Sequence, residues 1–169
     1  MSNSESLFTR NEVVRHADKS LHRVLKCIYP PVPGLADEDK EWEKGYAWLI
    51  ELNQPQALPY RVNHKTLQKS FRKLPEASNT ARDSMSEPLS ARTATEAQLA
   101  VAEAAWTRIE PLVSNSAESA DFDDELIFFP VHRSQLLKVR FLSGGGTPKT
   151  LLKDLRRYWQ GGQTMDALL

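Results

Sequence analysis

Short apolar runs separated by turn-forming residues mark the first third of the chain. The runs occupy residues 12–14, 23–29 and 46–52, and the intervening segments 30–34 and 53–55 contain proline with glycine or asparagine. Runs of this length bounded by turn residues are typical of β-strands. In residues 23–29 both alternating sets of positions are largely apolar, as in a strand covered on both sides. The pattern predicts a small β-rich, barrel-like domain.

A short helix is predicted after these strands. Asn63 suits the N-cap position, and Pro75 ends the helix because proline cannot continue it. Between them one apolar stripe recurs at spacings of four and three residues, formed by Leu67, Phe71 and Leu74. The opposite face carries a basic stripe, formed by Lys65, Lys69 and Lys73. That stripe is either a solvated face or a contact to DNA phosphates.

A regular helix follows a stretch of weakly patterned sequence. Residues 77–94 are rich in Ser, Ala and Thr and show no apolar periodicity, which indicates a flexible linker. Thr95 is a good N-cap for the next helix. Apolar positions then recur at three- and four-residue steps along one inward face: Leu99, Ala102, Trp106, Ile109 and Leu112.

The last forty residues predict two short helices joined by glycines. Pro130 suits a first helical position, and the helix it begins would end near Ser143. The glycines at 144–146 permit a tight turn. Thr147 then suits an N-cap, and the second helix would run to about Gln160. This is the pattern of a helix-turn-helix.

The predicted fold is therefore α+β with two domains. A β-rich domain with a closing basic helix occupies residues 6–76, the linker occupies 77–94, and a three-helix helix-turn-helix domain occupies 95–169.

The second helix of the pair has two different faces. Its apolar positions can pack on the preceding helix, and its polar face carries seven candidate DNA-binding residues: Thr147, Lys149, Thr150, Lys153, Arg156, Arg157 and Gln160. In a helix-turn-helix such a face enters the major groove, with its N-terminal residues at the base edges. The alternative is a solvated basic face on an ordinary helical hairpin.

Charge is strongly segregated along a chain whose net charge is zero. Residues 98–130 hold seven acids and one base, whereas residues 131–169 hold seven bases and two acids. A basic segment within a neutral protein favours a local contact with a polyanion.

The C-terminal segment resembles a known family of DNA-binding regions. Residues 147–169, TPKTLLKDLRRYWQGGQTMDALL, resemble the helix-turn-helix of TnsB-type transposases. These are DDE-superfamily transposases of the Tns family of bacterial transposons, related to the phage Mu transposase. The specific features are the block LRRYWQ at 155–160, the GQT at 162–164 and the final Ala167-Leu168. The resemblance is weaker over residues 96–146, and in the N-terminal part it is limited to the order of elements.

This resemblance implies sequence-specific binding of transposon-end DNA by the N-terminal part of a bacterial, cytoplasmic transposase. In the family, a ribonuclease-H-like core with three carboxylates on two metal ions follows this region. The 169 residues hold no such core, so we expect a non-catalytic, DNA-binding fragment of a longer protein. The implied partners are double-stranded DNA and, through the full-length protein, an endonuclease subunit and an ATPase regulator.

Other chemistry finds little support in the sequence, and no metal, cofactor or membrane partner is expected. The run Gly144–Thr150 differs from a phosphate-binding loop, because Pro148 stands where that loop has a glycine. The acidic cluster in 121–125 lacks the calcium-loop spacing and is expected to be solvated. The four histidines and single cysteine show neither zinc-ligand spacing nor a nucleophile–base pair.

Two other functions remain compatible with these patterns. One is a transcription regulator whose N-terminal domain binds a ligand or partner, and it would prefer promoter-like DNA. The other is a protein-interaction adaptor whose basic faces meet an acidic partner, and it would bind no duplex at physiological salt.

Overall fold

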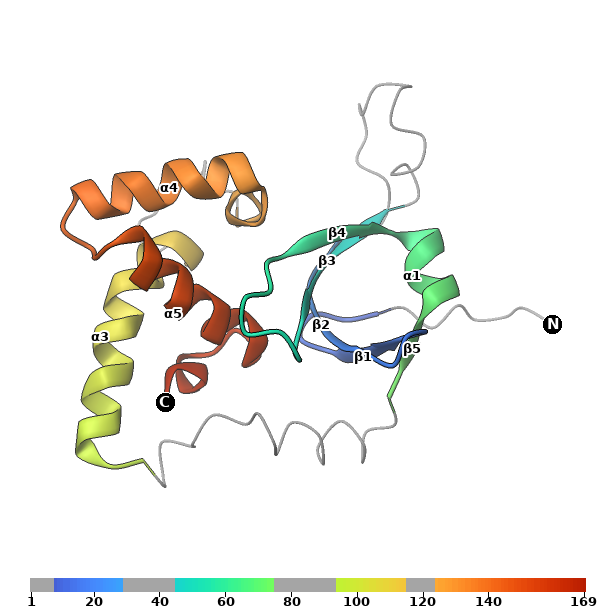
Figure 1. Cartoon of the computed structure of the whole chain (residues 1–169), viewed down its shortest axis with the longest axis horizontal. Helices are drawn as coiled ribbons and strands as arrows, with labels where there is room; N and C mark the ends of the chain where they lie inside the picture. The colour runs from blue at the N-terminus through green and yellow to red at the C-terminus, as the bar shows by residue number, and fades with distance from the viewer. Residues whose placement is uncertain (1–7, 29–44, 75–93, 115–123) are drawn as a thin grey trace.

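The computed structural model describes residues 8–28, 45–74, 94–114 and 124–169 of the chain. It confirms the α+β class: an antiparallel sheet is followed by three helices (Figure 1). The strands are β1 (Val13–His16), β2 (Leu21–Ile28), β3 (Tyr46–Glu51), β4 (Tyr60–Asn63) and β5 (Phe71–Lys73). Their order across the sheet is β4-β3-β2-β1-β5.

The sheet is open, so the expectation of a barrel-like domain was wrong. β4 and β5 form its two edges and do not pair with each other. The chain crosses from one edge to the other through α1 (His64–Ser70). A barrel would need those edges to exchange backbone hydrogen bonds, and here the helix lies between them.

Helix α1 is shorter than its apolar stripe predicts. Asn63 caps it as expected, accepting a hydrogen bond from the Thr66 N–H, but it ends at Ser70. Phe71–Lys73 instead pairs with β1 as strand β5. Phe71 still reaches the core, now from the strand, and Leu74, directly after β5, is also buried. The predicted basic stripe is therefore split between a helix and a strand.

Both faces of the sheet are buried, as the pattern of residues 23–29 predicts. A register shift between Val24 and Lys26 interrupts the pairing of β2 with β3. The face toward α1 packs an apolar cluster formed by Phe8, Val14, Val24, Ala47, Leu49, Val62, Leu67 and Phe71. The other face, which includes Leu25, Trp48 and Ile50, packs against the C-terminal helices.

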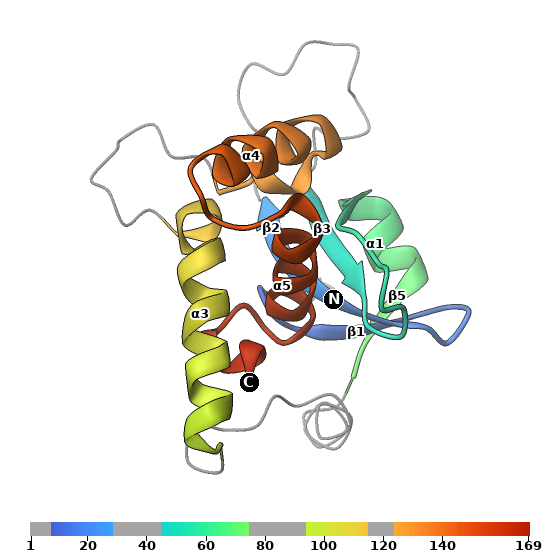
Figure 2. The ribbon, with the colours of Figure 1, turned by 60° about the vertical axis from the view of Figure 1, so that its left-hand side comes forward.

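Three α-helices and two short 3₁₀ segments make up the rest of the described chain. They are α3 (Glu96–Val113), η2 (Leu126–Phe128), α4 (Pro130–Leu142), α5 (Pro148–Gln160) and η3 (Met165–Leu168). Thr95 and Gln98 form a capping box at the start of α3. The predicted first residues of α4 and α5, both prolines, are confirmed. Figure 2 shows α5 between α3 and the sheet, with α4 across the top.

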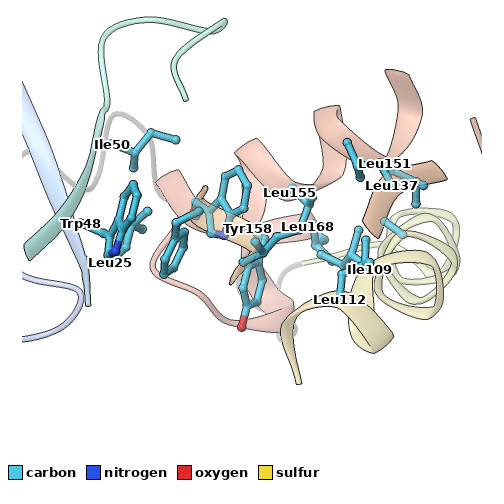
Figure 3. Close-up of a cluster of buried hydrophobic side chains, with 14 of the residues drawn as sticks. Leu25, Trp48, Ile50, Ile109, Leu112, Leu137, Leu151, Leu155, Tyr158 and Leu168 are labelled. Carbon is cyan, nitrogen blue, oxygen red and sulfur yellow. The ribbon is translucent and has the colours of Figure 1, made fainter. Parts of the chain in front are cut away.

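One continuous core joins the sheet to these helices (Figure 3). Leu25, Trp48 and Ile50 enter it from the strands, while Leu155 and Trp159 enter from α5. Trp159 is 1% exposed, and its ring lies 6.0 Å from that of Phe128. Phe141, on α4, is 48% exposed and does not belong to this core. The shared core places α5 directly against the sheet.

The segment before α4 is anchored by a buried acid. Glu125 accepts hydrogen bonds from the hydroxyl of Tyr46 at 2.6 Å and the indole N–H of Trp48 at 2.8 Å. Asp124 forms an ion pair with Lys26. The expectation of a solvated acidic loop is therefore wrong for the buried Glu125, whereas Asp124 stays 41% exposed although it is paired. The rest of that predicted loop and all but the last residue of the predicted linker lie outside the described residues.

No described helix has the length and apolar character that a membrane crossing requires.

Candidate nucleic-acid interface

The N-terminal half of α5 presents polar and basic side chains. Thr147 caps the helix, accepting from the Thr150 N–H at 3.3 Å, and Pro148 occupies its first turn. Leu151, Asp154 and Leu155 are buried on the inner side. The outer side of this half is exposed at Thr147, Lys149, Thr150 and Lys153. Amphipathicity thus orients α5 so that its N-terminal basic residues face outward.

A hollow of about 680 Å³ lies along this outer face. Helix α5 contributes Lys149, Thr150, Lys153, Arg156, Arg157 and Gln160, and the loop between β3 and β4 contributes Pro55 and Gln56. Four of these eight residues are cations and none is an acid. A concave surface lined by one sign of charge concentrates its potential, so this one favours an anionic ligand.

Two of the predicted residues also hold α5 against the sheet. Arg156 Nε donates to the carbonyl of Ala57 at 3.0 Å. Gln160 Nε2 donates to the carbonyls of Glu51 at 2.8 Å and Gln54 at 2.9 Å. These bonds give both side chains a structural role that the helix periodicity alone does not indicate.

The end of α5 is fixed from two sides. Arg157 Nη2 donates to the carbonyl of Leu168 at 2.6 Å. The buried Arg23 of β2 donates to the Gln160 carbonyl at 2.9 Å, where a cation also complements the helix dipole. Gly161 permits the close approach of η3, since a Cβ there would lie 2.4 Å from Ala167 Cβ. Ala167 is one of the residues that carry the family resemblance, and Gly161 lies between two of its blocks.

Contacts to the sheet continue after the helix. Gln163 donates through Nε2 to the carbonyl of Leu25 at 2.9 Å and to Asn11 Oδ1 at 2.8 Å. Arg10 donates to Gln163 Oε1 at 3.0 Å. The GQT motif at 162–164 is therefore a docking element, and its role could not be inferred from local sequence because its partners lie far away in the chain.

The inner side of α5 is positioned by an ion pair with α3. Arg108 Nε lies 2.8 Å from Asp154 Oδ2, and the Asp154 side chain is only 4% exposed. Asp154 lies on the buried, otherwise apolar face of α5. The apolar periodicity of the helix therefore gives no indication of this ion pair. The pair fixes the rotation of α5 and hence the direction of its basic face.

The other predicted basic residues lie elsewhere. Lys65 and Lys69 are exposed on α1, across the sheet from α5 (Figure 1). Lys73 lies on β5, with its ammonium 3.6 Å from Glu12 and 5.4 Å from the Phe8 ring centre. None of the three lines the hollow beside α5. Conversely, Pro55 and Gln56 line it although the sequence indicated only a turn there.

Metal-binding side chains do not converge in the described segments. There, no three His, Cys, Asp or Glu residues are grouped so that they could hold a metal ion.

Comparison with known proteins identifies the helical part of this arrangement. Residues 102–169 match the family described as the TnsB second domain. The resemblance to TnsB-type transposases is confirmed. The match takes in most of α3 and all of α4 and α5, and it leaves the sheet outside. No curated protein matches the chain.

The exposed face of α5 and the GQT segment at 162–164 both lie within the matched residues. The anchoring carbonyls of Glu51, Gln54 and Ala57 lie outside the matched residues. The exposed face of the matched region is thus completed by a loop from the preceding sheet.

Proposed function

We propose that this protein binds transposon-end DNA in a sequence-specific manner, as the DNA-binding part of a transposase. The observation that carries the proposal is the outer face of α5, where four cations and no acid line one hollow. The TnsB-type family supports duplex DNA as the anion. The helix-turn-helix arrangement of α4 and α5 supports insertion of α5 into a major groove.

Different parts of α5 take different roles in this proposal. Lys149, Thr150 and Lys153 are exposed near its N-terminus, the part of a recognition helix that meets base edges. Arg156 and Arg157 lie further along and contact phosphates. An arginine has five N–H donors, so the bonds to Ala57 and Leu168 leave others available for an anion.

The proposal gives the chain no catalytic step. Strand transfer by the full-length protein would depend on a metal-binding core, and would involve further transposition proteins such as an endonuclease subunit and an ATPase regulator. The contribution of this chain is to place the transposon ends for that core.

Binding specificity tests the proposal directly. Duplexes enriched from a random pool by the 169-residue protein should match the terminal repeats of the transposon that encodes it. A terminal-repeat duplex should then bind at least about 10³-fold more tightly than a scrambled duplex at physiological salt. Enrichment of promoter sequences would favour a regulator, and the absence of duplex binding would favour an interaction adaptor. Either result would overturn the proposal.

A further inference from the structure

The loop between β3 and β4 forms a tight turn beside α5. The Ala57 N–H donates to the Gln54 carbonyl at 3.1 Å, a bond that closes a four-residue turn. Pro55 and Gln56 occupy the two central positions. Proline restricts the backbone at its position, so the direction of the turn is preset. Both central residues are exposed and line the basic hollow.

This turn is attached to the helix it faces. Its first carbonyl, at Gln54, accepts from Gln160 Nε2, and its last, at Ala57, accepts from Arg156 Nε. Gln160 also binds the Glu51 carbonyl at the end of β3. Side chains of α5 thus bond to backbone on both sides of Gln56, so Gln56 keeps a defined position relative to Lys153 and Arg156.

We propose that this turn is a second DNA-contacting element, in which the Gln56 amide donates a hydrogen bond to a phosphate of the strand beside α5. The proposal rests on DNA binding by α5. The turn is bonded to the C-terminal half of the helix, Arg156 to Gln160, whereas the base-contacting positions lie in the N-terminal half. At that end a recognition helix is leaving the bases, so the neighbouring group is the backbone. A neutral amide suits this contact because it donates to phosphate without introducing a carboxylate into a basic hollow.

A neutral donor to phosphate has a distinctive signature. Gln56→Ala should weaken binding about tenfold on cognate and scrambled duplexes alike, because the contact reads no base. The slope of log K against log salt should stay unchanged, since glutamine neutralises no phosphate charge. Gln56→Glu should weaken binding further, because a carboxylate would then face phosphate. Ala100→Glu adds the same charge on the exposed side of α3 and should leave affinity nearly unchanged.

The experiment is a fluorescence-anisotropy titration of the full chain on both duplexes at several salt concentrations. Gln56 is exposed, so its variants should unfold at the temperature of the parent. Lys153→Ala is measured in the same series to test α5 independently. If Lys153→Ala weakens cognate binding while both Gln56 variants bind like the parent, the turn contacts no DNA and this inference fails alone. If the parent binds neither duplex, the proposed function fails, and this inference fails with it.

Discussion

Arg140 of α4 donates through Nη2 to the backbone carbonyl of Thr107 in α3, at 2.9 Å. In an uninterrupted helix that carbonyl would accept from the residue four positions later, which here is Pro111 and has no N–H. Arg140 Nε also donates to the Arg108 carbonyl at 2.9 Å. A side chain from α4 thus replaces the hydrogen bond that a proline removes from the neighbouring helix α3.

Replacing Arg140 should destabilise the fold through this carbonyl. Arg140→Ala should lower the free energy of unfolding by roughly 0.5–1.5 kcal/mol, because it removes the hydrogen bonds to the Thr107 and Arg108 carbonyls and the exposed Thr107 carbonyl can still be hydrated. Adding Pro111→Ala to that variant should restore part of the loss, since alanine supplies an N–H at position 111. Urea titrations of the two single variants and the double variant measure the coupling. Independent, additive effects would show that the proline and the arginine do not act on the same carbonyl.

The Arg108–Asp154 pair should respond unequally to loss of its two partners. The Asp154 side chain is 4% exposed and that of Arg108 is 30% exposed. Arg108→Ala should cost roughly 3–5 kcal/mol of stability because it leaves a buried carboxylate unpaired. Asp154→Ala should cost less, since the remaining guanidinium can reach water. Urea unfolding at pH 7 compares the variants, and a larger loss for Asp154→Ala would contradict this view of the pair.

His22 should make stability depend on pH in mildly acidic solution. It lies between the hydroxyls of Tyr60, 2.6 Å from Nδ1, and Ser20, 2.7 Å from Nε2. Ser20 donates its proton to the Asp18 carboxylate, so Nε2 of a neutral His22 donates to Ser20 and Nδ1 accepts from Tyr60. Burial, and secondarily the nearby His16, lower the pKa of His22 from 6.5 to about 4.

The sign of this dependence follows from the lowered pKa. The unfolded state takes up a proton near pH 6.5 and the folded state only near pH 4. The stability contributed by His22 is therefore complete above pH 6.5 and is lost as the pH falls to about 4, by up to about 3 kcal/mol. Hydrogen bonds from Ser20 lower the pKa of Asp18 to about 2, below this window.

A non-titrating residue isolates the histidine's contribution. His22→Gln should flatten the plot of unfolding free energy against pH between 6.5 and 4, while the more exposed His16→Gln should keep most of the slope. Equal slopes for the parent and His22→Gln would show that His22 is not the titrating group.

Helices α4 and α5 could be predicted from the sequence because the signals that start and end them are local. Thr147 and Pro148 start α5 where their backbone preferences suit a helix, and Gly161 follows its last residue. The strand at Phe71–Lys73 could not be predicted in this way. Its apolar spacing continues that of the preceding helix, and pairing with β1, almost sixty residues earlier, decides its conformation.

The candidate site shows the same division between local and distant information. Periodicity placed Lys149, Lys153, Arg156 and Gln160 on one face of α5, and the structure agrees. It could not show that Arg156 and Gln160 bond to backbone carbonyls about a hundred residues away, nor that Gln56 lies beside them. The helical pattern distinguishes the polar face of α5 from its apolar face. It does not show which residues of a distant segment lie against the polar face.

The central claim is that α5, rather than the basic face of α1, contacts the DNA. Two double variants that each remove two exposed lysines test it: Lys149→Ala with Lys153→Ala on α5, and Lys65→Ala with Lys69→Ala on α1. Anisotropy titrations on cognate and scrambled duplexes at several salt concentrations give affinity, specificity and salt slope together. The α5 pair should lose most of the discrimination between the duplexes, about 1–3 kcal/mol for each base contact removed, and the α1 pair should keep it. Parent-like specificity in the α5 pair, with weakened binding in the α1 pair, would contradict the account.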